Sequence, residues 1–342
     1  MLRLRRARVT VAGPPDAIEQ RLTIHSGGER RTAIADVALV GASEPGDEVV
    51  VNVEAVELGL GSGGADIVHV NLTRGLDGAG TPGAHVMKLN YTSLQHAVLP
   101  VEERDADGTP PPPQLPLNKP AAVLALHGQL AAVAWAFHQA TDGRSRLGYV
   151  QTAGGALPGG HSCVVRDLRA DGMLAGHLTA GPAFGGADGD AITTAAALHH
   201  GFAEMGWDAA VTGPGPGILG SASALGHGGL QALDSAHTAL ALGCETLLVP
   251  RMSSTDPRER HRGLSHHTRT VLDLLLAPVV VALPQDAERP QGDRHEWRSF
   301  TADLAGYTAS GLTTRSMGRE DPLFFAAALA AGTALAEATT RT

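Results

Sequence analysis

The chain of 342 residues has few cysteines, few aromatic residues and no excess of basic residues. Its two cysteines, Cys163 and Cys244, lie far apart and lack the spacing of a metal site, which is typical of packed thiols in a reducing compartment. Only 4% of its residues are aromatic, so we expect a core of small aliphatic side chains. Its formal net charge of −9 argues against a nucleic-acid partner, because such partners need a basic surface.

From the sequence we also expect no signal sequence and no apolar run that approaches the length of about 18 residues needed to span a membrane. Its basic N-terminus leads directly into the strand-like residues 9–11, with no apolar signal core between them. The sequence therefore predicts a cytoplasmic protein with no membrane partner.

A proline-rich segment at residues 105–120 separates two parts of different character. Its four consecutive prolines, 110–113, force an extended, semi-rigid chain that suits neither a helix nor a central strand. We therefore expect a small all-β domain at 1–104, a linker at 105–120 and an α/β domain at 121–342.

Short β-patterns separated by turn residues fill the part before the linker. Regular spacing of this kind predicts a small antiparallel domain, a β-barrel or a sandwich. The glycine-rich stretch 59–64 lacks the strand–turn–helix context of a phosphate-binding loop, so we interpret it as a tight hairpin. The predicted strands are 22–25, 35–40, 48–56 and 66–72.

After the linker, strand and helix patterns alternate from a strand at 121–126 to one at 279–283. This alternation predicts α/β architecture with a parallel, doubly wound sheet of five or six strands covered by helices. Ligands of such sheets bind beyond the carboxyl ends of the strands, where this chain has glycine-rich or polar loops. We therefore expect the functional site at that edge. The loops are 127–129, 151–155, 180–186, 213–223 and 251–267.

The most unusual stretch is 251–270, which carries five arginines and three histidines against two acids. In one interpretation, its arginines hold a phosphate or carboxylate through their planar guanidinium groups. Ser265 would cap the following helix and leave the amides of His266 and His267 facing the same anion. The arginines concerned are Arg251, Arg258, Arg260 and Arg262.

Two other interpretations of this stretch stay open. Asp256, His261, His266 and His267 could ligate a divalent metal, although adjacent histidines usually point apart and the spacing differs from that of a helical metal-binding pair. Alternatively, the arginines pair with acids of neighbouring loops and only fix a long connection. The sequence identifies no cofactor.

The stretch 213–217 alternates glycine and proline and leads to a helix that begins near Gly228. Its exposed backbone amides could bind an anion, aided by the helix start. The alternative is a tight turn that only lets strand and helix pack. The residues concerned are Gly213, Gly215, Gly217, Ser221 and Ser223.

An acid–base pair is available in every interpretation. A histidine that titrates near neutral pH, His127 or His267, could move a proton together with Asp190 or Asp256. Ser162 lies in no nucleophile motif, so we assign no nucleophile.

Several motifs form a distinctive set, and the most specific is Asp-Pro-Arg-Glu-Arg-His-Arg-Gly-Leu-Ser-His-His at 256–267. Through them the chain resembles, over nearly its whole length, a bacterial protein family of unknown function, the one numbered 3866. The resemblance implies an intact domain and no particular activity. The other motifs lie at 46–52, 58–64, 183–186, 213–217 and 225–227.

The sequence favours an enzyme that binds a small phosphorylated or otherwise anionic molecule at the carboxyl edge of the sheet. The alternative is a non-catalytic ligand sensor or assembly protein, since no unambiguous catalytic motif is present and the alanine-rich helices could form homo-oligomer contacts. RNA binding through 258–269 is a weaker hypothesis, because the chain is acidic and no aromatic residues are interleaved with the arginines.

Overall fold

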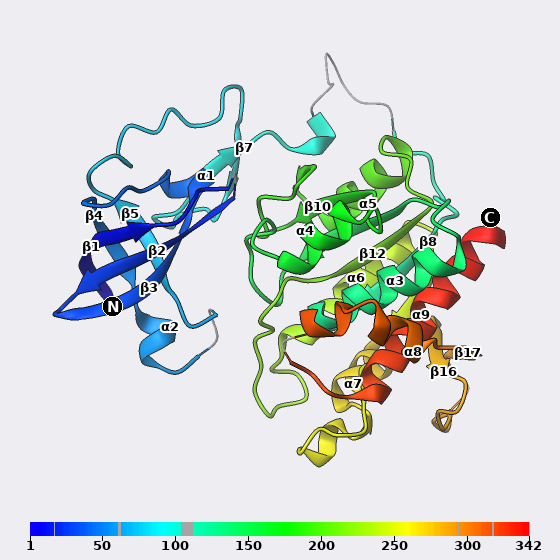
Figure 1. The fold of residues 1–342 in the computed structure, drawn as a ribbon. Helices are drawn as coiled ribbons and strands as arrows, with labels where there is room; N and C mark the ends of the chain where they lie inside the picture. Colours follow the sequence, from blue (N-terminus) through cyan, green and yellow to red (C-terminus); the bar gives the residue numbers. More distant parts are fainter. Residues whose placement is uncertain (17, 61–62, 104–111, 293, 317, 342) are drawn as a thin grey trace. The chain divides into compact units, whose positions relative to one another are not determined.

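The computed structural model describes residues 1–16, 18–60, 63–103, 112–292, 294–316 and 318–341 (Figure 1). The chain divides into two compact units, one up to Val98 and one from Leu99 onward. This division precedes the boundary expected at residue 104. Residues 104–111, which include the first part of the expected linker, lie outside the described residues.

The first unit is a closed barrel with the strand order β1-β2-β3-β5-β4. Neighbouring strands are antiparallel except β3 and β5, which are parallel. Alternate side chains such as Val9, Ile24 and Val49 fill its core, as the two-residue period of a strand requires. The predicted barrel-like domain is therefore confirmed. The strands are β1 (Leu4–Ala12), β2 (Glu19–Ser26), β3 (Glu29–Asp36), β4 (Glu48–Asn52) and β5 (Asp66–Asn71), with a separate hairpin of β6 (Val86–Lys88) and β7 (His96–Val98).

Local capping overrides one strand prediction in this unit. The strand expected at 35–40 ends at Asp36, whose carboxylate accepts a hydrogen bond from the Leu39 N–H at 3.2 Å. This bond caps the short helix α1 (Val37–Val40), because it satisfies a backbone donor at the helix start.

The connection from β4 to β5 also differs from the prediction. The strand expected at 48–56 ends at Asn52, and a helix, α2 (Glu54–Glu57), follows it. The antiparallel strands β4 and β5 are therefore joined by a connection that contains α2. This connection is longer than the tight hairpin expected at 59–64. Residues 61–62 of that stretch lie outside the described residues.

The second unit contains one sheet of eight parallel strands in the order β11-β10-β9-β12-β8-β13-β16-β17. The chain runs from β8 outward to β11, returns to β12, and continues through β13 on the other side of β8. The predicted doubly wound sheet is confirmed, with eight strands instead of five or six. They are β8 (Pro120–Leu124), β9 (Leu147–Thr152), β10 (Gly176–Ala180), β11 (Gly189–Ala191), β12 (Ala209–Pro214), β13 (Glu245–Val249), β16 (Val280–Pro284) and β17 (Glu296–Phe300).

Helices cover both faces of this sheet. Successive residues of β8 point to opposite faces, so Ala122 and Leu124 pack beneath α3, α4, α8 and α9, while Ala121 and Val123 pack beneath α5, α6 and α7. Burial on both faces explains why the strands are continuous apolar runs. The helices are α3 (Leu130–Ala140), α4 (Cys163–Ala170), α5 (Thr194–Ala203), α6 (Gln231–Ala241), α7 (His266–Leu274), α8 (Leu304–Ala309) and α9 (Pro322–Arg341).

The C-terminal helix α9 was not among the predicted elements. It packs so closely on α3 that a Cβ at Gly332 would lie only 2.4 Å from the carbonyl oxygen of Val133. In the part of the chain that the structure describes, α9 alone is long and apolar enough to cross a membrane, so the expectation that no stretch approaches this length was wrong. However, 67% of its apolar window is buried, which is consistent with a core helix of a soluble protein.

Candidate functional site

Loops that follow β8, β12 and β13 meet at the carboxyl edge of the sheet. His127, after β8, has its Nδ1 3.2 Å from the carbonyl oxygen of Pro214 at the end of β12. The side chain of Gln129 donates to the carbonyl oxygen of Pro250, after β13, at 3.0 Å. The order of strands reverses around β8, so this is the place where an open α/β sheet binds its ligands.

His127 is buried and bonded through both ring nitrogens. The Pro214 carbonyl can only accept a hydrogen bond, so Nδ1 carries the proton, and the Ser162 hydroxyl donates to Nε2 at 2.7 Å. Burial lowers the pKa of His127 to about 4, which keeps the ring neutral at neutral pH. Ser162 also caps α4 by accepting from the Val165 N–H at 3.2 Å.

Ser162, to which the sequence assigned no role, thus forms a serine–histidine pair with His127. Only 2% of Ser162 and 6% of His127 is exposed, so neither side chain reaches solvent freely. This burial favours a structural role for the pair. The catalytic role of His127 stays a prediction.

The glycine–proline stretch packs against the loop that follows β9. A Cβ at Gly215 would lie 2.2 Å from the Ala156 carbonyl oxygen, and the Ala156 N–H donates to the Pro216 carbonyl at 2.7 Å. This is the geometry of the close-packing alternative. Gly213 is still part of β12, and Gly217 follows in the turn with a φ of 70°. Anion binding at these amides stays a prediction.

The two serines of the following segment form a local turn. The Ser221 hydroxyl donates to the Gly226 carbonyl at 2.9 Å and accepts from the Ser223 N–H at 3.2 Å. A 3₁₀ turn begins at Gly228, as predicted, and α6 follows from Gln231.

Asp256 is the anchor of the arginine-rich loop. Arg258 donates two hydrogen bonds of 2.9 Å to its carboxylate, and Arg251 donates to it at 3.2 Å. Arg262 donates to its backbone carbonyl at 3.1 Å. The hydrogen bond from Arg258 is the largest cause of a pKa of Asp256 well below its usual range, so this carboxylate stays ionised. Three of the four predicted anion-binding arginines therefore already have a partner within the loop.

Arg260 differs from these arginines. It is exposed, and among the described residues it makes no ion pair or hydrogen bond. Its charge is the largest electrostatic cause, after burial, of the lowered pKa of His266. Within the described part of the chain, Arg260 is therefore an unpaired cation beside the histidines of the loop.

A short antiparallel hairpin brings those histidines together. Strand β14 (Met252–Ser253) pairs with β15 (Gly263–Leu264), and the Ser265 N–H donates to the Arg251 carbonyl at 2.9 Å. The hairpin folds the loop back on itself, so residues on both sides of it reach the start of α7.

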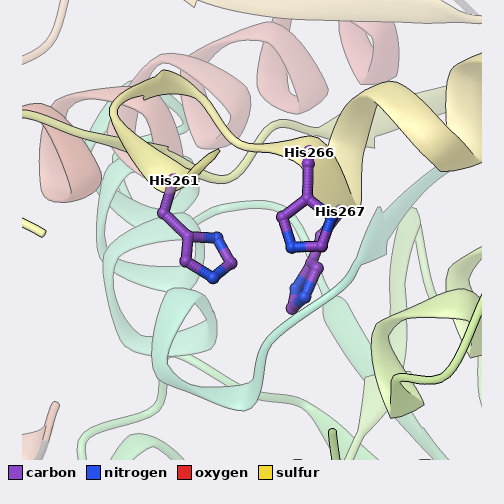
Figure 2. Close-up of side chains that lie close together, drawn as sticks. All are labelled: His261, His266 and His267. Carbon is purple, nitrogen blue, oxygen red and sulfur yellow. The ribbon is translucent and has the colours of Figure 1, made fainter. Parts of the chain in front are cut away.

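Three imidazole rings turn toward a common space at this point (Figure 2). His261 comes from the loop, and His266 and His267 come from the first turn of α7; one nitrogen of each lies within 4.8 Å of the others. The expectation that adjacent histidines point apart does not hold here, since the ring centroids of His266 and His267 are 4.4 Å apart.

A fourth histidine, which sequence reasoning missed as a site residue, completes the group. The ring of His227 stacks on that of His267 with centroids 3.6 Å apart. The only signal for it in the sequence was its place in the Leu225-Gly-His227 motif. We call His227, His261, His266 and His267 the histidine cluster.

The histidine cluster is neutral at neutral pH. Burial, followed by the charges of Arg251 and Arg258, lowers the pKa of His261 to about 4. Burial and the neighbouring His227 lower the pKa of His267 to about 2. Burial also lowers the pKa of His227 and of His266.

Hydrogen bonds orient two of these rings. Ser265 caps α7, as predicted, by accepting from the His267 N–H at 3.3 Å, and its Oγ lies 2.8 Å from Nδ1 of His261. Arg251 donates to Nδ1 of His267 at 3.1 Å. Both rings are therefore fixed at one nitrogen.

Other nitrogens of the histidine cluster are buried without a hydrogen bond. They are Nε2 of His266 and both ring nitrogens of His227. A contact with the Ala224 backbone opposes the lowered pKa of His227 without meeting hydrogen-bond geometry. Buried polar atoms usually have partners, so these nitrogens are available to a water molecule, a ligand or an ion.

A pocket of about 380 Å³ lies beside this loop. Arg258 and Arg319 line it together with Asp256, Glu320 and Asp321. Three acids against two arginines make it a poor place for an anion, so we do not assign the anion to it.

One comparison with known proteins identifies the family. The model of the family described as "Protein of unknown function (DUF3866)" matches residues 32–332. The chain belongs to this family. No curated protein and no solved structure matches the chain. The description of the family names no activity, so the geometry of the site is the basis for a function.

Proposed function

We propose that the protein is a cytoplasmic enzyme that acts on a small anionic molecule bound at the carboxyl edge of its parallel sheet. The observation that carries the proposal is Arg260, an exposed arginine without an ion pair among the described residues, beside a cluster of neutral histidines. Guanidinium groups bind phosphates and carboxylates through charge-assisted hydrogen bonds.

The surroundings of Arg260 support this choice. Arg251 and Arg258 keep the field around the histidine cluster positive, since their charges lower the pKa of His261. The N-terminus of α7 adds a smaller attraction for an anion, about 0.3–1 kcal/mol. Neutral imidazoles can donate and accept hydrogen bonds at the same place.

A thermal-shift screen tests the binding step. Phosphorylated and carboxylated metabolites are added to the full chain, and compounds that raise its Tm are retained. Arg260→Ala is expected to remove most of that stabilisation, while Arg289→Ala, which also changes an exposed arginine of the second unit, leaves it intact. An equal response of wild type and Arg260→Ala to every compound would remove Arg260 from the site.

A turnover measurement separates the enzyme from the alternative, a non-catalytic ligand sensor. The sensor stays open because the His127–Ser162 pair is buried and does not reach solvent freely. Retained compounds are incubated with the protein and followed by mass spectrometry. Consumption that is lost in Arg260→Ala supports the enzyme, whereas a bound compound that is never converted supports the sensor. A homo-oligomer stays a prediction.

A further inference from the structure

We infer that His261, His266 and His267 form a binding site for a divalent transition-metal ion of the zinc class. The inference goes beyond the proposed function, because it concerns a cofactor and does not require an anionic substrate. Four independent features of the histidine cluster support it.

The first feature is the convergence of the rings. One nitrogen from each of the three histidines lies within 4.8 Å of the others, and Figure 2 shows the rings facing one space. A tetrahedral zinc ion with bonds of about 2.1 Å holds its nitrogen ligands about 3.4 Å apart. Modest rotations of the three side chains therefore close the site around an ion.

The second feature is the set of orphaned nitrogens. Nε2 of His266 is buried and makes no hydrogen bond. His227 is only 6% exposed, and neither of its ring nitrogens makes a hydrogen bond among the described residues. Leaving such groups unpaired costs about 1–3 kcal/mol each, a cost that a ligated ion removes at His266.

The third feature is the support behind the rings. The Ser265 hydroxyl lies 2.8 Å from Nδ1 of His261. In the tautomer with its proton on Nδ1, this ring donates to the hydroxyl, and the lone pair of Nε2 is free for an ion. A metal-bound histidine usually has such a partner on its second nitrogen. Ser265 also fixes the first turn of α7, which carries the other two ligands.

The fourth feature is the chemistry of the donors. Neutral imidazoles suit zinc, nickel, copper and iron, whereas magnesium and calcium require oxygen ligands. The carboxylate of Asp256, which the sequence offered as a fourth ligand, is already held by Arg251 and Arg258. Three histidine ligands leave a fourth position open, as in catalytic zinc sites, for water or an anion.

The positive charges of the nearby arginines repel a metal ion, and Arg251 also competes with the ion for His267. Arg251 donates to Nδ1 of His267, so the neutral ring carries its proton on Nε2. His267 therefore joins the ion only when Arg251 releases it. Arg251 keeps Asp256 as a partner after that release, at 3.2 Å.

A metal titration of the untagged, metal-stripped full chain tests the inference with no anionic substrate present. We expect one Co²⁺ per chain with the intense visible absorption of a four-coordinate ion, displaced by one Zn²⁺. His261→Ala and His266→Ala are expected to weaken binding by more than about 100-fold, since changes even behind the ligands cost 10–100-fold.

His199→Ala is the matched control, because His199 and His200 form another adjacent pair, on α5. Its metal affinity should equal that of wild type. The inference is overturned by wild type without saturable binding, by unchanged binding in both site variants, or by an equal loss in His199→Ala. His266 is only partly buried, so His266→Ala decides if His261→Ala does not fold. Failure of this titration leaves the anion screen, which needs no metal, as a separate result.

Discussion

His127 and the histidine cluster lie at the carboxyl edge of the same sheet and differ in how their nitrogens are used. His127 is bonded through both ring nitrogens. Its neighbour His177 stacks on Tyr149 and accepts from the Ala187 N–H at 3.3 Å, but Nε2 of His177 is buried without a hydrogen bond among the described residues. In the histidine cluster, three nitrogens are buried without a hydrogen bond. The partners of His127 therefore favour a structural role for it, and the convergence of three rings favours a binding role for the histidine cluster.

This difference teaches that burial and a lowered pKa do not by themselves mark a functional histidine. Burial lowers the pKa of His127 and of His261 alike, each to about 4. Only the partners and the surrounding charge separate the two groups. His127 has a serine and a backbone carbonyl on its two nitrogens, whereas His261 has a serine at Nδ1 only and faces His266 and His267.

The largest expected effect is the loss of stability in His127→Ala. The change leaves a cavity and removes a partner of Ser162, so we expect a destabilisation of about 3 kcal/mol. Denaturant unfolding measures it, and the metal titration of the same variant should still reach one ion per chain. A stable variant that binds no metal would reverse the roles of the two groups.

The pH dependence of the unfolding free energy is expected to reveal the burial of His127. Folded His127 has a pKa of about 4, against 6.5 for the ordinary side chain, so the unfolded chain takes up a proton first as the pH falls. The free energy of unfolding therefore decreases as the pH falls from about 6.5 to 4, by at most about 3 kcal/mol from this residue.

His127→Gln isolates that contribution, because glutamine does not titrate. Its unfolding free energy, measured at pH 7.5 and pH 4.5 alongside wild type, should fall less than that of wild type over this interval. Parallel curves for the two proteins would show that His127 is not held neutral by the fold.

A smaller effect is expected from Arg251 on the metal. Arg251→Gln removes a positive charge and the competitor for Nδ1 of His267, so Co²⁺ should bind about tenfold more tightly, in line with one charge at short range in a partly screened site. The measurement is a Co²⁺ titration with Arg30→Gln as the control. Weaker binding would mean that Arg251 supports the site instead of opposing the ion.

The smallest expected effect on stability is that of Arg260→Ala. Arg260 is exposed and makes no ion pair among the described residues, so the unfolding free energy should change by less than about 0.5 kcal/mol. Its affinity for the anionic ligand should still fall about tenfold, the cost of about one charge-assisted hydrogen bond. A calorimetric titration with a retained compound measures that loss.

The sequence predicted the architecture well because its signals are local. The apolar runs of β8 and β13 and the alternation with helices identify a parallel sheet, and the ligand-binding edge follows from that topology. It overlooked α9, in which glycine, threonine and glutamate interrupt the apolar pattern. It also read α1 as strand, since the cap by Asp36 lies at one residue only.

The contacts of the candidate site could not be predicted, because they depend on pairings between distant residues. The hairpin of β14 and β15 brings His261 back to the start of α7, and neither two-residue strand has a pattern of its own. The stacking of His227 on His267 joins segments that follow different strands. Which nitrogens lack partners is a consequence of these pairings.

Crystals of the full chain soaked in Zn²⁺, with anomalous diffraction recorded at the zinc edge, give the most direct test of the account. We predict one peak at about 2.0–2.1 Å from a nitrogen of each of His261, His266 and His267, with Arg251 turned away from His267. A peak at His127 or elsewhere in the molecule, or none near these three rings, would contradict it.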